Sequence, residues 1–106
     1  MVTINDFKNF DIRVATIKEV VDHPEADKLY VLKVDFGDKQ KQLVAGIKLS
    51  YTKEDLLGKQ IAVIDNLEPA VIRGQESQGM LLAAQDESGI AILSPERNVK
   101  EGSVVR

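Results

Sequence analysis

The chain contains no cysteine, which excludes disulfides, thiolate metal sites and a cysteine nucleophile. Histidine is almost as scarce, because His23 is the only one available as a general base or an imidazole metal ligand. No apolar run approaches the roughly 20 residues that a membrane-spanning helix needs, and no signal peptide is recognisable. We therefore expect a cytoplasmic protein without a membrane partner.

The length and composition are those of an ordinary globular protein. With 106 residues, 43% of them apolar and 29% charged, residues 1–106 are expected to form one domain with one core. There is no linker, repeat or low-complexity segment to divide it.

Charge is distributed unevenly along the chain. The net charge is −3, yet residues 28–53 contain six lysines and two aspartates. A local excess of lysine within an acidic protein indicates either a solvated lysine-rich face or a binding surface for an anionic partner.

β-Branched residues and turn signals predict a chain made mostly of strands. The expected strands cover residues 11–22, 28–36, 41–47, 60–67, 69–74, two segments on either side of the turn at 86–89, and the C-terminal residues. A shift in the apolar phase predicts a bulge near Ala15 or Thr16. Thr3 with Asp6, and Thr52 with Asp55, are spaced as helix capping pairs.

Five strands with one short helix inserted after the third predict an all-β fold of the OB type, a five-stranded Greek-key barrel. A two-sheet sandwich with the same strands is the alternative. The strands after residue 67 exceed a minimal barrel, so they either extend it or form an interface.

The stretch RGQESQGMLLA (73–83) first suggests a nucleophile, because Ser77 lies between Gly74 and Gly79. The spacing is one residue longer than the G-x-S-x-G elbow, and a strand follows where a helix is required. No phosphate-binding or dinucleotide-binding glycine motif is present. We expect no catalytic residue and no cofactor.

Four residues that can bind metals follow the first long strand: Asp22, His23, Glu25 and Asp27. One histidine among local carboxylates is a weak metal signal, and acids that cap a turn explain the same pattern. We expect no metal site.

The 73–83 loop is instead suited to binding. Ser77 and Gln78 can reach phosphate or ribose oxygens, and Met80 is either a contact for a nucleobase or the first core residue of a strand. Tyr30 and Tyr51 lie in or beside the lysine-rich region and could stack on bases, although Tyr30 shares a face with Leu32 and is expected in the core.

Several blocks carry a family resemblance when they are taken together: FDIRVATI, HPEADKLYVLKVDFG, LVAGI, GKQIAVIDNLEPAVIRG and SQGMLLAA. From about Phe7 to Arg106 the chain resembles the tRNA-binding domain found in three settings. It occurs at the C-terminus of methionyl-tRNA synthetases, as a separate synthetase β chain, and as a free-standing structure-specific tRNA-binding protein.

The resemblance implies an OB-fold whose C-terminal strands form a homodimer interface, and a surface that recognises tRNA by its shape. It implies no chemistry, because the domain supplies tRNA affinity to a separate methionyl-tRNA synthetase catalytic chain. By the same resemblance, the residues facing RNA are Lys28, Lys48, Asn66, Arg73, Ser77 and Met80. Ser77 would donate to the RNA backbone, Arg73 and the lysines would neutralise phosphates, and Asn66 would position the loop or contact ribose.

The sequence departs from the family pattern at positions that are usually basic. Glu68 and Val71 replace lysines, and Glu76 adds a negative charge to the loop. We therefore expect weak, salt-sensitive RNA binding, with Val71 either in the core or at a partner contact. The alternatives are a dimerisation or docking module of a synthetase, and a chaperone-like relative whose groove takes peptides.

Overall fold

The computed structural model describes every residue from Met1 to Arg106. Two short helices and ten strands follow along the chain, and neither helix has the length or apolar character to cross a membrane. In order, the elements are α1 (Ile4–Phe7), β1 (Ile12–Asp22), β2 (Tyr30–Asp35), β3 (Gln40–Ala45), α2 (Lys53–Leu56), β4 (Gln60–Ile64), β5 (Ala70–Ile72), β6 (Gln75–Ser77), β7 (Met80–Leu81), β8 (Ala83–Asp86), β9 (Gly89–Ile92) and β10 (Val104–Val105).

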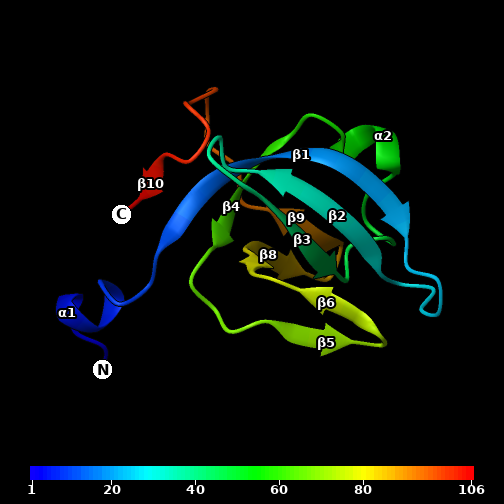
Figure 1. Ribbon diagram of the computed structural model, residues 1–106, viewed down its shortest axis with the longest axis horizontal. Coiled ribbons are helices and arrows are strands. Elements are labelled where there is room, and N and C mark those ends of the chain that lie inside the picture. The colour runs from blue at the N-terminus through cyan, green and yellow to red at the C-terminus, as the bar shows by residue number, and fades with distance from the viewer.

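One antiparallel sheet curls into a nearly closed barrel (Figure 1). Its strands run in the order β3-β2-β1-β4-β7, and β10 adds to the beginning of β1. β1 is the central strand of this sheet, since its first half pairs with β4 and its second half with β2. Five strands in one sheet, with α2 between β3 and β4, confirm the predicted all-β OB-fold. A sandwich would divide these strands between two sheets.

β1 contains the predicted bulge, two residues beyond Thr16. Ile17 pairs with Val34 and Glu19 with Lys33, so the exposed Lys18 is the extra residue. Ala15 and Thr16 themselves keep regular pairing with β4. The phase shift marks where β1 leaves β4 and continues on β2.

The barrel closes between β3 and the turn from β6 to β7 through four hydrogen bonds. Gln78 donates from its main-chain nitrogen to the Gln42 oxygen over 2.8 Å. The other three use side chains: Gln42 N–H donates to Gln78 Oε1 at 2.8 Å, Val44 N–H to Ser77 Oγ at 3.0 Å, and Gln42 Nε2 to the Glu76 oxygen at 2.9 Å. Side chains thus complete the closure between β3 and the 76–79 segment.

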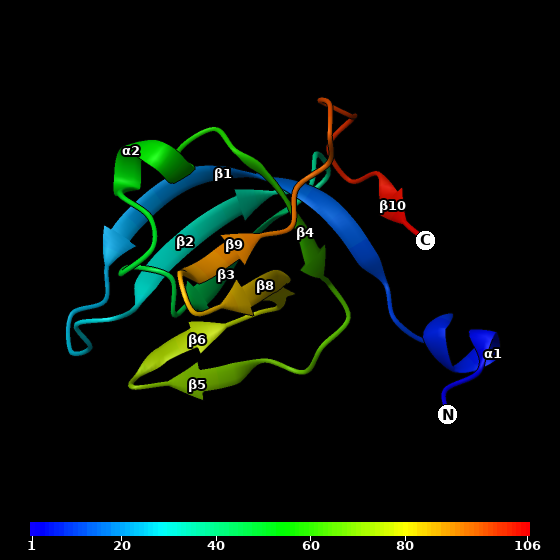
Figure 2. The same cartoon turned by 180° about the vertical axis from the view of Figure 1, so that it is seen from behind.

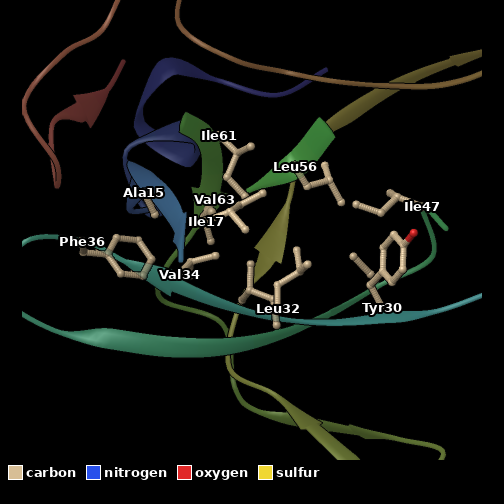
Figure 3. Close-up of a cluster of buried hydrophobic side chains, with 12 residues drawn as sticks. Ala15, Ile17, Tyr30, Leu32, Val34, Phe36, Ile47, Leu56, Ile61 and Val63 are labelled. Carbon is tan, nitrogen blue, oxygen red and sulfur yellow. The ribbon is translucent and has the colours of Figure 1, made fainter. Parts of the chain in front are cut away.

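The core fills the barrel with mainly aliphatic side chains from β1, β2, β3 and β4 (Figure 3). Tyr30 and Leu32 point inward as predicted, Val34 and Phe36 continue the same alternation, and Leu56 on α2 is fully buried. Tyr30 belongs to this core, where its hydroxyl donates to the Tyr51 oxygen at 2.8 Å. The complete cluster comprises Ala15, Ile17, Tyr30, Leu32, Val34, Phe36, Leu43, Ala45, Ile47, Leu56, Ile61 and Val63.

Both predicted capping pairs are present. Thr3 accepts from the Asp6 amide at the start of α1, and Thr52 accepts from the Asp55 amide at the start of α2, each with the reciprocal bond. The backbone and side-chain hydrogen bonds from Thr52 lower the pKa of Asp55. α2 closes one end of the barrel, whereas α1 has no buried residue.

Two hairpins stand outside the barrel path, β5–β6 and β8–β9. The first has a two-residue turn in which Arg73 (φ 53°) and Gly74 (φ 88°) both adopt left-handed backbone conformations. This turn matches the right-handed twist of the strands it connects. Its tip approaches the loop between β1 and β2, as both views show (Figures 1 and 2).

We predict that Gly79→Ala destabilises the fold, because Gly79 lies where the barrel closes. A Cβ there would lie 2.9 Å from the Ile64 main-chain oxygen and 3.3 Å from Leu43 Cδ2. Relieving this overlap should lower the free energy of unfolding by about 1–3 kcal/mol, measured by urea denaturation. Gly46→Ala is the control, since its nearest neighbour would be Leu29 Cδ2 at 3.5 Å. Equal stability of the two variants would contradict the crowding argument.

Candidate nucleic-acid interface

The lysine-rich region does not form an uncompensated basic face, because four of its six lysines are paired with two aspartates. Lys39 and Lys41 contact Asp65, and Lys48 and Lys53 contact Asp22. The remaining two, Lys28 and Lys33, are exposed and have no carboxylate partner. Most of the charge of this region is therefore neutralised locally, and a smaller share is exposed without a carboxylate partner.

Asp65 is buried at the end of β4, with 4% of its surface exposed. Lys39 Nζ donates to its Oδ2 at 2.7 Å. Lys41 Nζ lies 2.6 Å from Oδ1 but directs a hydrogen bond to the Asp65 main-chain oxygen, so Oδ1 is held by charge and not by an aligned hydrogen bond. Burial is the largest single influence and would raise the pKa of Asp65. The two lysines together outweigh it and lower that pKa.

Asp22 forms the second pair of contacts at the other end of β1. Lys48 and Lys53 lie 3.1 Å and 3.3 Å from its two oxygens, and these hydrogen bonds lower the pKa of Asp22. Lys48 also lies above the Tyr30 ring, 6.0 Å from its centroid. The carboxylate is exposed, so water screens these contacts.

Three of the predicted RNA-facing residues meet around the loop of residues 23–29. Lys28 belongs to this loop, and its main-chain oxygen accepts from the Lys48 amide at 3.4 Å. Arg73, at the tip of the β5–β6 hairpin, donates from Nη2 to the Glu25 oxygen at 3.2 Å. We call the surface of loop 23–29 together with the hairpin tip 72–74 the loop–hairpin surface. The fold brings Lys28, Lys48 and Arg73 together there.

Asn66 lies at the opposite end of β1. Its Oδ1 accepts from the Asp11 amide at 2.9 Å, and its Nδ2 donates to the Asn9 oxygen at 2.8 Å. It therefore positions the segment before β1, and the fold does not bring it to the loop–hairpin surface.

Ser77 has a different role from the one expected. It is buried, with 5% exposed; its hydroxyl donates to the Gly79 oxygen at 2.9 Å and accepts from the Val44 amide. A hydroxyl has one proton to donate, and here it is used within the protein. The expectation that Ser77 donates to the RNA backbone is therefore contradicted, and Ser77 is part of the barrel closure.

Met80 and Val71 are both outside the core. Met80 pairs with Ile64 on the barrel but is 50% exposed, and Val71 is 72% exposed. Of the alternatives for Met80, a surface contact is retained and a core position is not. Val71 likewise keeps only its partner-contact interpretation.

Sequence reasoning missed several residues of this surface. Gln42 and Gln78 close the barrel and, with Lys33, Gln40, Lys41 and Glu76, line a polar hollow on the outside of β2 and β3. Three consecutive polar residues at the start of β3, Gln40 to Gln42, are the signal that could have found them. His23, considered from the sequence as a metal ligand or part of a turn, is buried and uses both ring nitrogens for hydrogen bonds. No group of three or more histidine or acidic side chains is arranged to hold a metal ion.

Comparison with known proteins places the chain in a family. Residues 12–104 match the tRNA binding domain family. The chain belongs to this family. The resemblance inferred from the sequence blocks is therefore confirmed. As a tRNA binding domain, it corresponds to a non-catalytic part of methionine–tRNA ligases.

The relatives of this tRNA binding domain include methionine–tRNA ligases and a chaperone protein. It is 53% identical over 105 residues to the methionine–tRNA ligase of Thermococcus onnurineus. The aligned region covers 99% of this chain but 14% of the ligase. The chain thus spans a small part of its curated relatives. A MetRS-related protein from Pyrococcus horikoshii is similar in structure, with a TM-score of 0.93 and 32% identity over 100% of this chain and 98% of that one. The CsaA chaperone protein of Picrophilus torridus is also similar in structure, with a TM-score of 0.94 and 38% identity over the whole of both chains.

We predict that Asp65 makes the domain sensitive to acid. Because folding lowers its pKa from the ordinary value of 3.8, its ion pairs stabilise the fold above that value. This contribution is lost as the pH falls below about 4 towards the lower folded-state pKa. Asp65→Asn should cost about 1–3 kcal/mol at neutral pH, less than for a fully buried pair because both lysines reach solvent.

The measurement is the free energy of unfolding of wild type and variant between about pH 3 and pH 6. Asp38→Asn is the control, because that carboxylate is exposed and has no cationic partner. An acid-induced loss of stability as steep in Asp65→Asn as in wild type would rule out this role for Asp65.

Proposed function

We propose that residues 1–106 act as one non-catalytic tRNA-binding module in the cytoplasm, which recognises tRNA by shape and raises the tRNA affinity of a methionyl-tRNA synthetase catalytic chain. The observation that supports this most is the loop–hairpin surface, in a member of the tRNA binding domain family. There, Lys48 and Arg73, from two other segments, each donate a hydrogen bond to the loop that carries Lys28.

The chemistry of this surface suits a phosphate backbone. Arg73 donates one hydrogen bond to the Glu25 oxygen, and its other guanidinium donors are available to an anion. Lys28 has no carboxylate partner. Cationic contacts of this kind fix position and orientation without reading sequence, which agrees with recognition by shape. Met80, on the barrel, is exposed and available for an apolar base contact.

The same charges argue for modest affinity. Lys48 and Lys53 both contact Asp22, which offsets part of their charge. Glu68, shortly before β5, and Glu76, in β6, are exposed on the segment that carries Arg73. Each carboxylate near the phosphate path reduces the counterion release that drives binding. Weak binding alone is suited to a module that acts by being attached to, or assembled with, a second chain.

We predict that Arg73→Ala and Lys28→Ala each weaken tRNA binding without unfolding the domain. Each should make the slope of log K against log salt less negative by about one. Lys48→Ala should have a smaller effect, because the ion pair with Asp22 already offsets part of the charge of Lys48. The measurement is a labelled-tRNA titration at several salt concentrations, with an RNA duplex of matched length as competitor.

Lys100→Ala is the matched control: an exposed lysine without a carboxylate partner, in the segment that packs near Gly37 at the far end of β2. If Arg73→Ala and Lys28→Ala bind tRNA like this control, the proposed site is refuted. If the duplex competes as well as tRNA, recognition by shape is refuted.

We further propose that the domain is a homodimer, as its unpartnered apolar surfaces suggest. An apolar hollow of about 460 Å³ is lined mainly by apolar residues such as Leu82, Leu93 and Val104. On the same side of the molecule, α1 projects away from the barrel (Figure 1) and exposes Ile4 and Phe7. A second copy could cover both surfaces by one two-fold contact.

Leu93→Glu is predicted to yield a monomer, because Leu93 is 47% exposed in one chain and would be buried against its partner. Sedimentation equilibrium of variant and wild type provides the measurement. Leu57→Glu is the control, since Leu57 is 60% exposed near α2, away from the hollow. A monomeric wild type at micromolar concentration would contradict the dimer.

Two alternatives stay open to the same measurements. A docking module that joins synthetase subunits is favoured by the two aspartate–lysine clusters, because they leave fewer free lysines for RNA. Such a module would co-purify with a synthetase chain in the absence of tRNA. The likeness to the CsaA chaperone protein favours a peptide-binding relative, which would bind unfolded peptide in preference to tRNA.

A further inference from the structure

One of the two aspartate–lysine clusters lies directly beside the loop–hairpin surface. Asp22 is the last residue of β1, so it immediately precedes loop 23–29. Lys48 Nζ lies 3.1 Å from its Oδ1, and Lys53 Nζ lies 3.3 Å from its Oδ2. The main-chain nitrogen of Lys48 also donates to the Lys28 oxygen, which joins this cluster to the loop. The end of β1 and the segment that leads into α2 lie side by side in both views (Figures 1 and 2).

The two clusters differ in burial. The side chain of Asp65 is 4% exposed, whereas that of Asp22 is 51% exposed. No ion pair or hydrogen bond other than those with the two lysines holds the Asp22 carboxylate. Exposed ion pairs contribute little to stability, because water screens them and their long side chains must be held in one geometry. The contacts of Asp22 can therefore be exchanged for others without loss of the fold.

The two ammonium groups are placed to hold a phosphate. Each contacts a different oxygen of one carboxylate. The two non-bridging oxygens of a phosphodiester also share one negative charge, so they can accept the same two contacts. The Lys48 ammonium is further held above the Tyr30 ring. Tyr30 and residues 48–55 line a hollow of about 410 Å³, which leaves room for an anion beside the lysines.

The other acids of this hollow do not engage the two lysines. Asp55 caps α2 through Thr52, and the nearby charge of Lys59 acts on it. Glu54 is exposed and forms no ion pair with either lysine, although its charge opposes an anion in the hollow. Asp22 is thus the carboxylate that an incoming phosphate would have to displace.

We propose that Lys48 and Lys53 form a second phosphate site beside the loop–hairpin surface, which Asp22 occupies in the free domain and leaves when an RNA phosphate binds. Asp22 is then an internal competitor that limits tRNA affinity. The use of this site by tRNA rests on the function proposed above, whereas the competition between Asp22 and a phosphate does not.

The first arm of the test needs no RNA. Inorganic tripolyphosphate is titrated into the domain at constant ionic strength, and the amide NMR shifts of residues 48–53 are followed. Asp22→Asn should bind it about three- to tenfold more tightly than wild type, because two exposed ion pairs no longer have to be broken.

Asp38→Asn is the matched control for both arms. It changes the net charge equally, but Asp38 follows β2, whereas Asp22 pairs with Tyr30 at the beginning of that strand. Screening by salt should leave its effect small. Equal midpoints for wild type and Asp22→Asn, or an equal gain in Asp38→Asn, would overturn the proposal.

The second arm measures the affinity for labelled tRNA at several salt concentrations. Asp22→Asn should bind about three- to tenfold more tightly than wild type at low salt. Its slope of log K against log salt should be more negative by about one, because one more positive charge is left for phosphate. The gain should disappear when Lys48 and Lys53 are both replaced by alanine.

The outcomes separate the two proposals. A gain in tRNA affinity no larger than that of Asp38→Asn, or one that persists without the two lysines, would overturn Asp22 as the internal competitor. Absence of tRNA binding by both wild type and Asp22→Asn would refute the proposed function instead. The tripolyphosphate titration would still decide whether Asp22 competes for the two-lysine site.

Discussion

The closure of the barrel between β3 and residues 76–79 is the constraint on which the rest of the structure depends. β7 pairs with β4 and has no strand pairing with β3, so the side chains of Gln42, Ser77 and Gln78 supply most of the hydrogen bonds that close the barrel. Gly79 must lack a Cβ because the Ile64 oxygen is too close. This closure fixes where β6 ends, and β6 in turn sets the direction of the hairpin whose tip carries Arg73.

The position of the proposed binding surface therefore follows from the same closure. The connection from β4 to β7 is long enough to form a hairpin, and its tip reaches the loop after β1. His23 in the loop bonds to the Ile72 oxygen, and Arg73 on the tip bonds to the Glu25 oxygen. Loops at the ends of OB-fold strands are the segments that commonly bind ligands, while the barrel holds them in place. Here two such loops are joined into one surface, and the lysines on the barrel wall are largely neutralised by Asp22 and Asp65.

The sequence predicted the local and the repetitive features well. The capping pairs of Thr3 and Thr52, the inward face of β2 and the all-β OB-fold depend on near neighbours or strict alternation, so they can be read along the chain. The neutralised lysines could not be predicted, because Asp65 is far in sequence from Lys39 and Lys41 and meets them only in the barrel. Ser77 was misassigned because its position between glycines does not reveal that it points inward.

Hydrogen exchange of the domain with and without tRNA tests the central claim most directly, namely that loop 23–29 and the hairpin tip 72–74 form one RNA-binding surface. The account predicts that tRNA slows exchange in both segments together and leaves β8 and β9 unchanged. Slowing that is confined to β8, β9 or the C-terminal residues, with no change at the loop or the hairpin tip, would contradict it.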